Sequence, residues 1–398
     1  MIPLKVYLKA NREKSILKRH PWIFSGAIQK IPENIQPGST AAIYSSTGNF
    51  LAWASINPKS QIAARILSWC EEEEINEAFI HQKILSAVGK RKDSISSEES
   101  DSYRCFYTES DGIPGLIIDI YHDQLVIQIT SAGAEYWRTT IIEACQKITG
   151  VAGCFERSDE DIRKLEGLAP SKGVLFGNNK NNFVEIEEWG IRYLVDVQKG
   201  QKTGFYLDQR QNRKKLREYS KNRSVLNCFS YTGGFTLNAL AGDCAEVISI
   251  DSSKDAIFLA KRNMELNSLP NERDNWVEGD VFLELRKFRD SGRKFDLIVL
   301  DPPKFAPTYN SIPKATRAYK DINLLAFKLL EVGGTLFTFS CSGGISTDLF
   351  QKIVQGAALD AKREVTILER LRQDIDHPVP LSFPEAEYLK GLVCSIQE

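Results

Sequence analysis

The sequence predicts an α/β protein with a C-terminal Rossmann-like domain, preceded by a small β-rich domain and a central α+β domain. From about residue 225 the chain repeats strand, turn and helix, which is typical of a parallel sheet with crossover helices. Before that point, short β-rich segments between Pro and Gly turns give way to mixed helix and strand. At 398 residues, the chain is also too long for one ordinary core.

The first predicted domain, residues 1–75, is mostly β. Its three β-rich segments are residues 4–8, 40–44 and 50–54.

The second predicted domain, residues 76–190, combines helices and strands. Residues 76–89 have the pattern of an amphipathic helix, and residues 90–102 are polar and linker-like. A hairpin that turns at His122 and Asp123 follows, and a helix is expected at residues 134–149. The third predicted domain, residues 191–398, contains the alternating pattern.

Composition places the chain among soluble folded proteins. Hydrophobic residues make up 42% and charged residues 26%. No run of eighteen apolar residues and no secretory signal pattern occurs, so we expect a cytoplasmic protein that does not contact membranes. The eight cysteines form no Cys-x-x-Cys pair and no zinc pattern, so no metal is expected. A homodimer is compatible with the sequence.

The net charge of −1 conceals two basic stretches. Residues 1–65 contain nine Lys or Arg against two acids, a net of +7, and residues 199–223 again contain nine against two. Two separated basic surfaces suit an extended polyanion, because each phosphate contact releases counterions. Lys14, Lys18 and Arg19 are therefore candidate RNA contacts, although such runs are also found on merely solvated surfaces.

A glycine turn follows the first strand of the alternating pattern. That strand ends at Phe229 and continues into Ser-Tyr-Thr-Gly-Gly-Phe at residues 230–235. Glycines let the backbone approach a ligand, and the N–H groups of the next helix point toward it. Phe229, Tyr231, Gly233 and Gly234 are therefore predicted to line a cofactor pocket.

Acidic residues follow the next three strands. Asp251 ends the second strand, where a carboxylate can accept both hydroxyls of a ribose. Asp280 follows the third strand as a candidate acceptor for an adenine amine, and Asp301 ends the fourth. Carboxyl ends of parallel strands meet at one edge, so a nucleoside cofactor is predicted there. The alternative for any single Asp is a helix cap.

The turn also indicates which nucleoside is bound. A dinucleotide dehydrogenase needs Gly-x-Gly-x-x-Gly to leave room for a pyrophosphate, and this turn lacks that pattern. S-adenosylmethionine carries no phosphate, so it is the expected cofactor.

A cysteine follows the fifth strand. Residues 335–340 are β-rich and lead into Cys341, which should lie at the same edge as Asp301. Carbon 5 of cytosine becomes nucleophilic only after a thiolate adds to carbon 6, and Cys341 is the candidate thiolate. The alternative is a small buried residue, but polar neighbours on both sides favour a functional role. Asp301, or a water it holds, is the candidate base for the carbon-5 proton, with His377 a weaker one.

Seven segments across nearly the whole chain resemble the RlmI-like family of bacterial large-subunit ribosomal RNA cytosine-5 methyltransferases. The segments are HPWIFSG at 20–26, KTGFYLDQR at 202–210, NCFSYTGGF at 227–235, LDPPKF at 300–305, YKDIN at 319–323, FSCSG at 339–343 and HP at 377–378.

The resemblance implies a PUA domain, a linking domain and a class I methyltransferase domain. It implies 5-methylcytosine formation in 23S ribosomal RNA, naked or in an assembling subunit, with Cys341 as nucleophile. It also places Gln209 and Arg210 beside the cofactor pocket, and Lys304 is expected to contact RNA. The residues implied to hold S-adenosylmethionine are Gly233, Gly234, Asp251 and Asp280.

Two other functions compete with this one. A methyltransferase acting on an exocyclic base amine would place an aromatic residue after Asp-Pro-Pro, where this chain has Lys304, followed by Phe305. A non-enzymatic RNA-binding assembly factor would keep a degenerate cofactor domain, but the acids at 251, 280 and 301 are all present.

Overall fold

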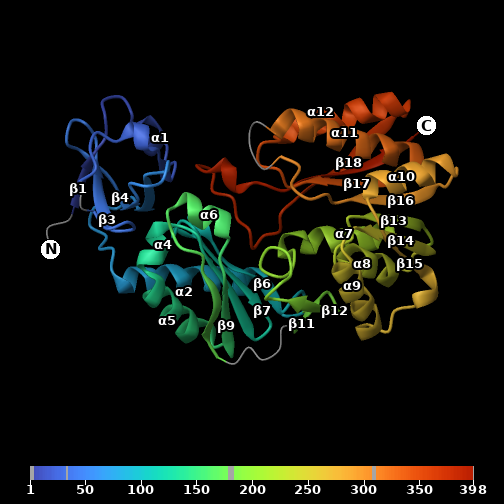
Figure 1. Ribbon diagram of the computed structural model, residues 1–398, viewed down its shortest axis with the longest axis horizontal. Helices are drawn as coiled ribbons and strands as arrows, with labels where there is room; N and C mark the ends of the chain where they lie inside the picture. The colour runs from blue at the N-terminus through green and yellow to red at the C-terminus, as the bar shows by residue number, and fades with distance from the viewer. Residues whose placement is uncertain (1–3, 33–34, 178–182, 307–310, 398) are drawn as a thin grey trace. The chain divides into compact units, whose positions relative to one another are not determined.

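The computed structural model describes residues 4–32, 35–177, 183–306 and 311–397, and Figure 1 shows their elements. They form two compact units. The first unit comprises Met1–Glu188, Val195–Leu207 and Ile375–Ala386, and the second comprises Trp189–Leu194, Asp208–Asp374 and Glu387–Glu398. A segment near the end of the chain therefore returns to the first unit before the last strand completes the second.

The first unit begins with a five-stranded sheet in the order β1-β3-β4-β5-β2. Its strands are β1 (Leu4–Tyr7), β2 (Trp22–Ile23), β3 (Thr40–Tyr44), β4 (Phe50–Ile56) and β5 (Ala64–Ser68). A single helical turn, α1 (Lys14–Leu17), lies between the first two strands. All three predicted strands form, because their apolar residues enter one buried cluster.

A second five-stranded sheet has the order β10-β9-β8-β7-β6. Its strands are β6 (Ser102–Tyr107), β7 (Leu116–Tyr121), β8 (Gln124–Ile129), β9 (Gly153–Arg157) and β10 (Lys172–Phe176). The predicted hairpin is confirmed: β7 and β8 pair antiparallel and His122 takes a left-handed φ of 52°. The remaining helices of this part are α2 (Glu77–Ser94), α3 (Thr108–Asp111), α4 (Ala132–Tyr136), α5 (Arg138–Thr149) and α6 (Glu160–Leu165).

The buried carboxylate of Glu166 connects the two sheets of the first unit. It accepts hydrogen bonds from Asn57 at 2.9 Å, Ser60 at 2.6 Å and Arg65 at 2.8 Å, all in or beside the first sheet. The backbone N–H of Ala132 donates to it at 3.3 Å. Burial alone would oppose ionisation, but Arg65 and the other donors outweigh it and lower the pKa of Glu166.

The second unit is built on a seven-stranded sheet in the order β15-β14-β13-β16-β17-β19-β18. Its strands are β13 (Ser224–Cys228), β14 (Glu246–Asp251), β15 (Asp274–Glu278), β16 (Phe295–Leu300), β17 (Leu330–Ser340), β18 (Val365–Arg372) and β19 (Lys390–Ile396). The first five are parallel, and β19 lies antiparallel between β17 and β18. The predicted parallel sheet is therefore confirmed.

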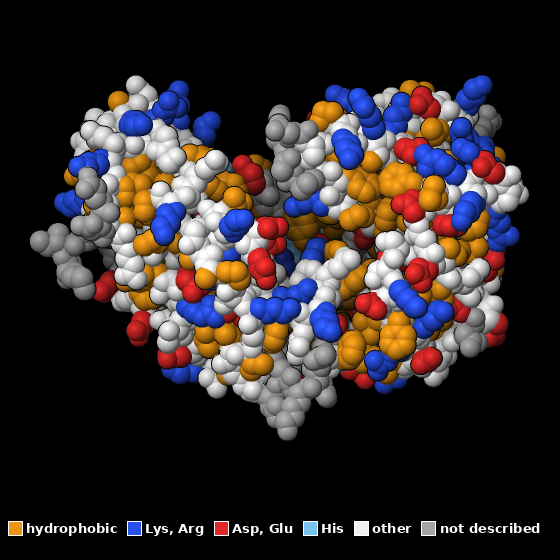
Figure 2. Space-filling model, viewed as in Figure 1, with side chains coloured by type: hydrophobic (Ala, Val, Ile, Leu, Met, Phe, Trp, Pro, Cys, Tyr) orange, Lys and Arg blue, Asp and Glu red, His pale blue; other side chains and the backbone are white. Residues whose placement is uncertain are grey.

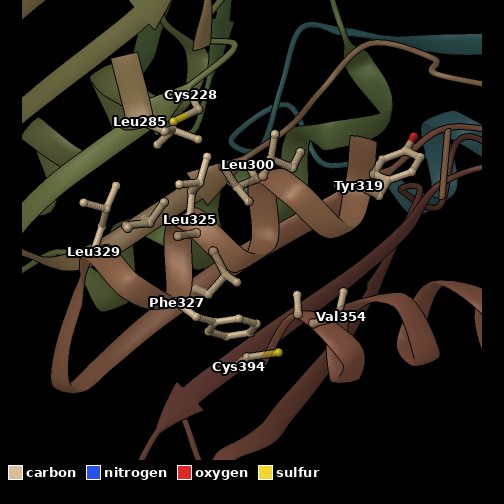
Figure 3. Close-up of a cluster of buried hydrophobic side chains, with 14 of the residues drawn as sticks. Cys228, Leu285, Leu300, Tyr319, Leu325, Phe327, Leu329, Val354 and Cys394 are labelled. Carbon is tan, nitrogen blue, oxygen red and sulfur yellow. The ribbon is translucent and has the colours of Figure 1, made fainter. Parts of the chain in front are cut away.

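Helices cover both faces of this sheet, α7 to α9 on one and α10 to α12 on the other (Figure 1). They are α7 (Arg210–Tyr219), α8 (Gly234–Ala241), α9 (Lys254–Leu266), α10 (Val281–Asp290), α11 (Ile312–Leu329) and α12 (Thr347–Ala361). Helix α11 buries residues at helical spacing, among them Ala315, Tyr319 and Ile322. Figure 3 shows part of this helix in a cluster with side chains of β13, β16, β19, α10 and α12.

Two local predictions were wrong. The polar stretch 90–102 is not all linker, because α2 continues to Ser94. The polar composition of this stretch suggested an exposed linker, but Arg91 is buried, and its guanidinium donates two hydrogen bonds of 2.7 Å to the carboxylate of Asp111. The helix predicted at 134–149 is two helices that meet at Trp137.

Within the described ranges, no helix has both the length and the apolar character that crossing a bilayer requires. The same residues contain no cluster of His, Cys, Asp or Glu suited to a metal ion.

Candidate functional site

The turn after β13 has an unusual backbone. Phe229, Tyr231 and Gly233 have φ values of 62°, 48° and 84°. Left-handed φ at two aromatic residues costs free energy and persists only where the surroundings fix it, which is characteristic of functional turns. The turn leads directly into α8, whose first N–H groups lie at this edge of the sheet.

Packing as well as the positive φ disfavours a side chain at Gly233. A Cβ atom there would lie 2.9 Å from Leu237 and 3.0 Å from the ring of Trp276. At Gly234 the added Cβ would lie 2.9 Å from Arg213, a flexible side chain. The first glycine is therefore the more constrained of the two.

Asp251 lies at the end of β14 and contacts the turn directly. Its Oδ2 accepts a hydrogen bond from the backbone N–H of Tyr231 at 2.8 Å, and its Oδ1 accepts one from Ser253 at 2.8 Å. The residue is half-buried. Each carboxylate oxygen can accept a further bond, so Asp251 can hold a diol while it fixes the turn.

Asp280 occupies the predicted place after β15, but it is exposed and caps α10. Its Oδ1 accepts a hydrogen bond from the backbone N–H of Leu283 at 3.0 Å. One carboxylate oxygen of Asp280 therefore acts as a helix cap, which was the alternative to cofactor binding.

Two buried hydroxyls near the turn have no hydrogen-bond partner among the described residues. They are Ser230 Oγ and Thr232 Oγ1. Buried polar atoms are nearly always paired, so these two indicate a polar ligand or water at the turn. Together with the carboxylate of Asp251 and the absence of a side chain at Gly233, these hydroxyls fit a nucleoside cofactor.

Cys341 follows the end of β17 and is half-buried, whereas Cys70 is exposed and the other six cysteines are buried. Leu300 and Thr338 are register partners at the adjacent ends of β16 and β17. The Cys341 sulfur lies 3.8 Å from the carbonyl oxygen of Pro302, the residue after Asp301. The structure thus brings the two loops together, as predicted.

Ser342 anchors the loop that carries Cys341. Its hydroxyl accepts a bond from the backbone N–H of Ala306 at 3.1 Å and shares one with Tyr319 at 3.0 Å. Its carbonyl oxygen accepts a bond of 3.0 Å from the ammonium group of Lys390 on β19. Burial raises the pKa of Tyr319 to about 12, so this phenol stays protonated.

Sequence reasoning missed Lys390. It is only 6% exposed, and burial lowers its pKa to about 8. The available signal was a lone lysine at the start of an apolar run, Lys-Gly-Leu-Val-Cys.

Gln209 and Arg210 lie at the start of α7 and are buried. Arg210 forms an ion pair with Asp374 at 2.6 Å, and Gln209 accepts a bond of 2.6 Å from Asn212. Both residues therefore have protein partners in the second unit. Lys304 is exposed, and the ring of Phe305 packs 4.9 Å from that of Tyr319 and 5.9 Å from that of Phe282.

The basic residues predicted near the chain's start surround α1. Lys14 begins that helix, and Lys18 and Arg19 follow it, all three exposed. In the view of Figure 2, Lys and Arg predominate over Asp and Glu on the surface of the N-terminal part of the chain that contains α1 and the first sheet. The guanidinium of Arg19 lies 4.9 Å from the ring centre of Trp69, beside a cavity of about 320 Å³ that Lys83 also lines. Glu33, one of the two acids counted in this stretch, lies outside the described residues.

The second basic stretch, residues 199–223, is not one exposed surface. Arg210 and Arg213 are buried. Arg217 donates to the side chain of Asn238 at 2.8 Å and to the carbonyl of Trp189 at 3.1 Å. Much of this charge therefore stabilises the packing of α7, which net charge along a sequence does not reveal.

His377 is buried in the first unit, with its Nδ1 2.7 Å from Asp376 and its ring against Tyr107. This environment suits a structural histidine.

Two models of protein families match this chain, one in its N-terminal part and one in its C-terminal part. Residues 6–69 match the model of a PUA-like domain. Residues 171–393, more than half of the chain, match the model of an S-adenosylmethionine-dependent methyltransferase.

Curated relatives match the full length. A protein of Erwinia tasmaniensis named ribosomal RNA large subunit methyltransferase I is 48% identical over 99% of this chain and 99% of its own. A protein of Escherichia coli O139:H28 with the same name is 45% identical with the same coverage.

Solved structures support the fold. A protein from Streptococcus mutans, assigned as an S-adenosylmethionine-dependent methyltransferase, superposes with a TM-score of 0.85 at 22% identity, over 98% of this chain and 100% of its own. An S-adenosylmethionine-dependent methyltransferase from Agrobacterium tumefaciens gives 0.52 at 17% identity, over 75% and 91%. The family model and the full-length relatives show that this chain belongs to the family of S-adenosylmethionine-dependent methyltransferases.

Proposed function

We propose that this protein transfers a methyl group to carbon 5 of a cytosine in large-subunit (23S) ribosomal RNA. The observation that carries the proposal is the position of Cys341, half-buried after β17 with its sulfur 3.8 Å from the Pro302 carbonyl. The names of the full-length relatives support the substrate class. A cytoplasmic location follows from that substrate.

The cofactor would be held at the carboxyl edge of the sheet. Asp251 would accept the ribose hydroxyls, and Asp280 would use its second oxygen for the adenine amine. The turn from Phe229 to Gly234, including Tyr231, would also hold the cofactor, together with Asp301. Gln209 and Arg210 would support the pocket from the start of α7. When bound, S-adenosylmethionine supplies an electrophilic methyl group.

The chain's own groups would prepare the acceptor. The Cys341 thiolate adds to carbon 6 of the cytosine, which makes carbon 5 nucleophilic toward the methyl group. Once carbon 5 carries the methyl group, Asp301, or a water it holds, removes the proton from carbon 5, and the thiolate leaves carbon 6. Cytosine thereby regains its double bond and Cys341 is regenerated.

RNA would be bound by basic side chains in both units. Lys14, Lys18 and Arg19 would contact phosphates from the first unit, and Lys304 from the Asp-Pro-Pro loop of the second. These contacts would contribute affinity for RNA of any sequence, and the target base would be selected by residues at the carboxyl edge of the sheet.

Three domains would share these tasks: residues 1–75 as the RNA-binding PUA-like domain, 76–190 as a linking domain and 191–398 as the methyltransferase. The family matches at 6–69 and 171–393 support the outer two.

Neither competing function is favoured by the site. An exocyclic-amine enzyme needs an aromatic ring directly after Asp-Pro-Pro, where this chain has Lys304, and the half-buried Phe305 packs against Tyr319 and Phe282. An assembly factor without catalysis gives no reason for a half-buried Cys341 beside the Asp301 loop.

Mapping 5-methylcytosine in ribosomal RNA from cells with and without the gene tests the proposal. We expect one large-subunit position to lose its methyl group in the deletion strain and regain it on complementation. An unchanged cytosine-5 methylation map, with loss of a methylated amine elsewhere, would favour the exocyclic-amine function.

A further inference from the structure

We propose that Lys390 is a positioning residue whose ammonium group stabilises the thiolate form of Cys341. This inference rests on the proposed function, in which Cys341 is the nucleophile. It assigns a role to a buried lysine for which the proposed reaction has no other use.

The geometry places Lys390 against the cysteine loop. Its register partner on β17 is Ser340, the residue before Cys341, so the backbone of Lys390 lies beside the end of the strand that leads into the cysteine loop. Its Nζ donates a bond of 3.0 Å to the carbonyl oxygen of Ser342, the residue after Cys341. The ammonium group is thereby anchored on the backbone that flanks the sulfur.

A buried lysine carries a cost that a stability role does not explain. Lys390 is 6% exposed, and among the described residues no Asp or Glu forms an ion pair of 4 Å or less with it. A buried cation without a close carboxylate is expensive unless it interacts with another anion. The thiolate of Cys341 is such an anion, as is the carboxylate of Glu387, and of the two Cys341 raises the pKa of Lys390 more.

The charged and titratable groups around the pair are Glu387, Lys304, Tyr319 and Arg372. Burial lowers the pKa of Lys390 to about 8; Cys341 and Glu387 raise it, and Lys304 lowers it further. Tyr319 of α11 faces the cysteine as a protonated phenol. On β18, the register partner of Lys390 is the exposed Arg372. Electrostatic interaction is mutual, so the cation that Cys341 stabilises must stabilise the thiolate in return.

Formation of the thiolate needs no acid or base other than Lys390 and Cys341. When the pair shares a single proton, moving it from the Cys341 sulfur to the Lys390 nitrogen converts thiol and amine into thiolate and ammonium. When the thiolate attacks carbon 6 of the base, Lys390 keeps its proton and its bond to Ser342.

The test is the pH dependence of alkylation at Cys341 by iodoacetamide, followed by mass spectrometry of its peptide in the full-length protein. Neither RNA nor cofactor is needed. In the wild type we expect the midpoint to lie below that of an ordinary thiol, near pH 8.5. Lys390→Met should raise it by about one pH unit or more, because a nearby opposite charge shifts a titration by that much.

Two further variants separate charge from structure. Lys390→Arg keeps a cation and should hold the midpoint nearer to the wild-type value than Lys390→Met does. Lys352→Met removes an exposed lysine from α12 and should leave it unchanged. Circular dichroism checks that each variant is folded.

A wild-type midpoint at or above pH 8.5 would overturn the inference even if Lys390→Met fails to fold. So would a folded Lys390→Met protein with an unshifted midpoint. A shifted midpoint in a protein that makes no 5-methylcytosine would instead count against the proposed function alone.

Discussion

Asp251 and Tyr231 are joined by a hydrogen bond of 2.8 Å between the carboxylate of the first and the backbone N–H of the second. The end of β14 thus fixes the shape of the turn after β13. The residue predicted to bind the cofactor ribose also maintains the turn on which the cofactor would lie.

Asp251→Ala should therefore weaken S-adenosylmethionine binding by about 1.5 to 3 kcal/mol, because the diol loses a charged acceptor. Isothermal titration calorimetry measures the change. Asp296→Ala is the matched control: Asp296 accepts a bond of 2.8 Å from the Ser224 N–H and links β13 to β16 at the opposite edge of the sheet. If both variants lose the same affinity, Asp251 acts through general stability rather than through the site.

Gly233→Ala should abolish measurable cofactor binding and lower the free energy of unfolding. The added methyl group would meet Leu237 and Trp276, and left-handed φ itself costs about 1 to 2 kcal/mol for an alanine. Gly292→Ala separates the two effects, because Gly292 has a similar φ of 72° with nothing within 4 Å of the added atom. Equal destabilisation and equal affinity in the two variants would contradict the packing argument.

Glu166→Gln should lower the free energy of unfolding of the first unit by about 3 kcal/mol at pH 7, because Arg65 loses the nearer of its two buried carboxylate partners and keeps Glu109 at 3.4 Å. The folded-state pKa of Glu166 is lowered, so its stabilisation is present above pH 4.5 and is lost as the pH falls through the folded value. Urea unfolding at several pH values should show the wild type and the variant converging below pH 4.5. Glu143→Gln, at an exposed position of α5, should change little. A constant difference across this range would rule out the titration of Glu166 as its source.

Replacing Lys14, Lys18 and Arg19 together with Gln should weaken RNA binding and flatten its salt dependence. Each phosphate that the protein no longer neutralises reduces the slope of log K against log salt by about 0.7 to 0.9. Fluorescence anisotropy with a ribosomal RNA fragment at several salt concentrations measures this slope. A control variant replaces three exposed lysines of the second sheet and its helices, Lys147, Lys164 and Lys172. An unaltered slope in the first variant would mean that the region around α1 does not bind phosphate.

The edge of the sheet that we propose for the cofactor could be located from the sequence because its determinants are local. Each candidate directly follows a strand, and in a parallel sheet all such positions meet at one edge. Asp251, Asp301 and Cys341 needed only their strands to be recognised.

Lys390 was not predictable in the same way. Its place beside Cys341 depends on the antiparallel insertion of β19 between β17 and β18, a pairing between segments far apart in the sequence. The same limitation applies to two buried ion pairs, Arg91 with Asp111 and Arg210 with Asp374. The sequence shows that a residue is charged, but not whether the fold buries it against a residue of opposite charge. The segments that looked like linker or basic surface were interpreted wrongly for this reason.

Trapping with RNA that contains 5-fluorocytosine tests the central claim most directly, because fluorine cannot leave carbon 5 as a proton does. The wild-type protein, incubated with this RNA and S-adenosylmethionine, should form an adduct that survives denaturation, and so should Cys70→Ala, which removes the exposed cysteine. Cys341→Ala should form none and should not methylate unmodified RNA. An adduct that persists in Cys341→Ala, or normal methylation by that variant, would contradict the assignment of Cys341 as the nucleophile.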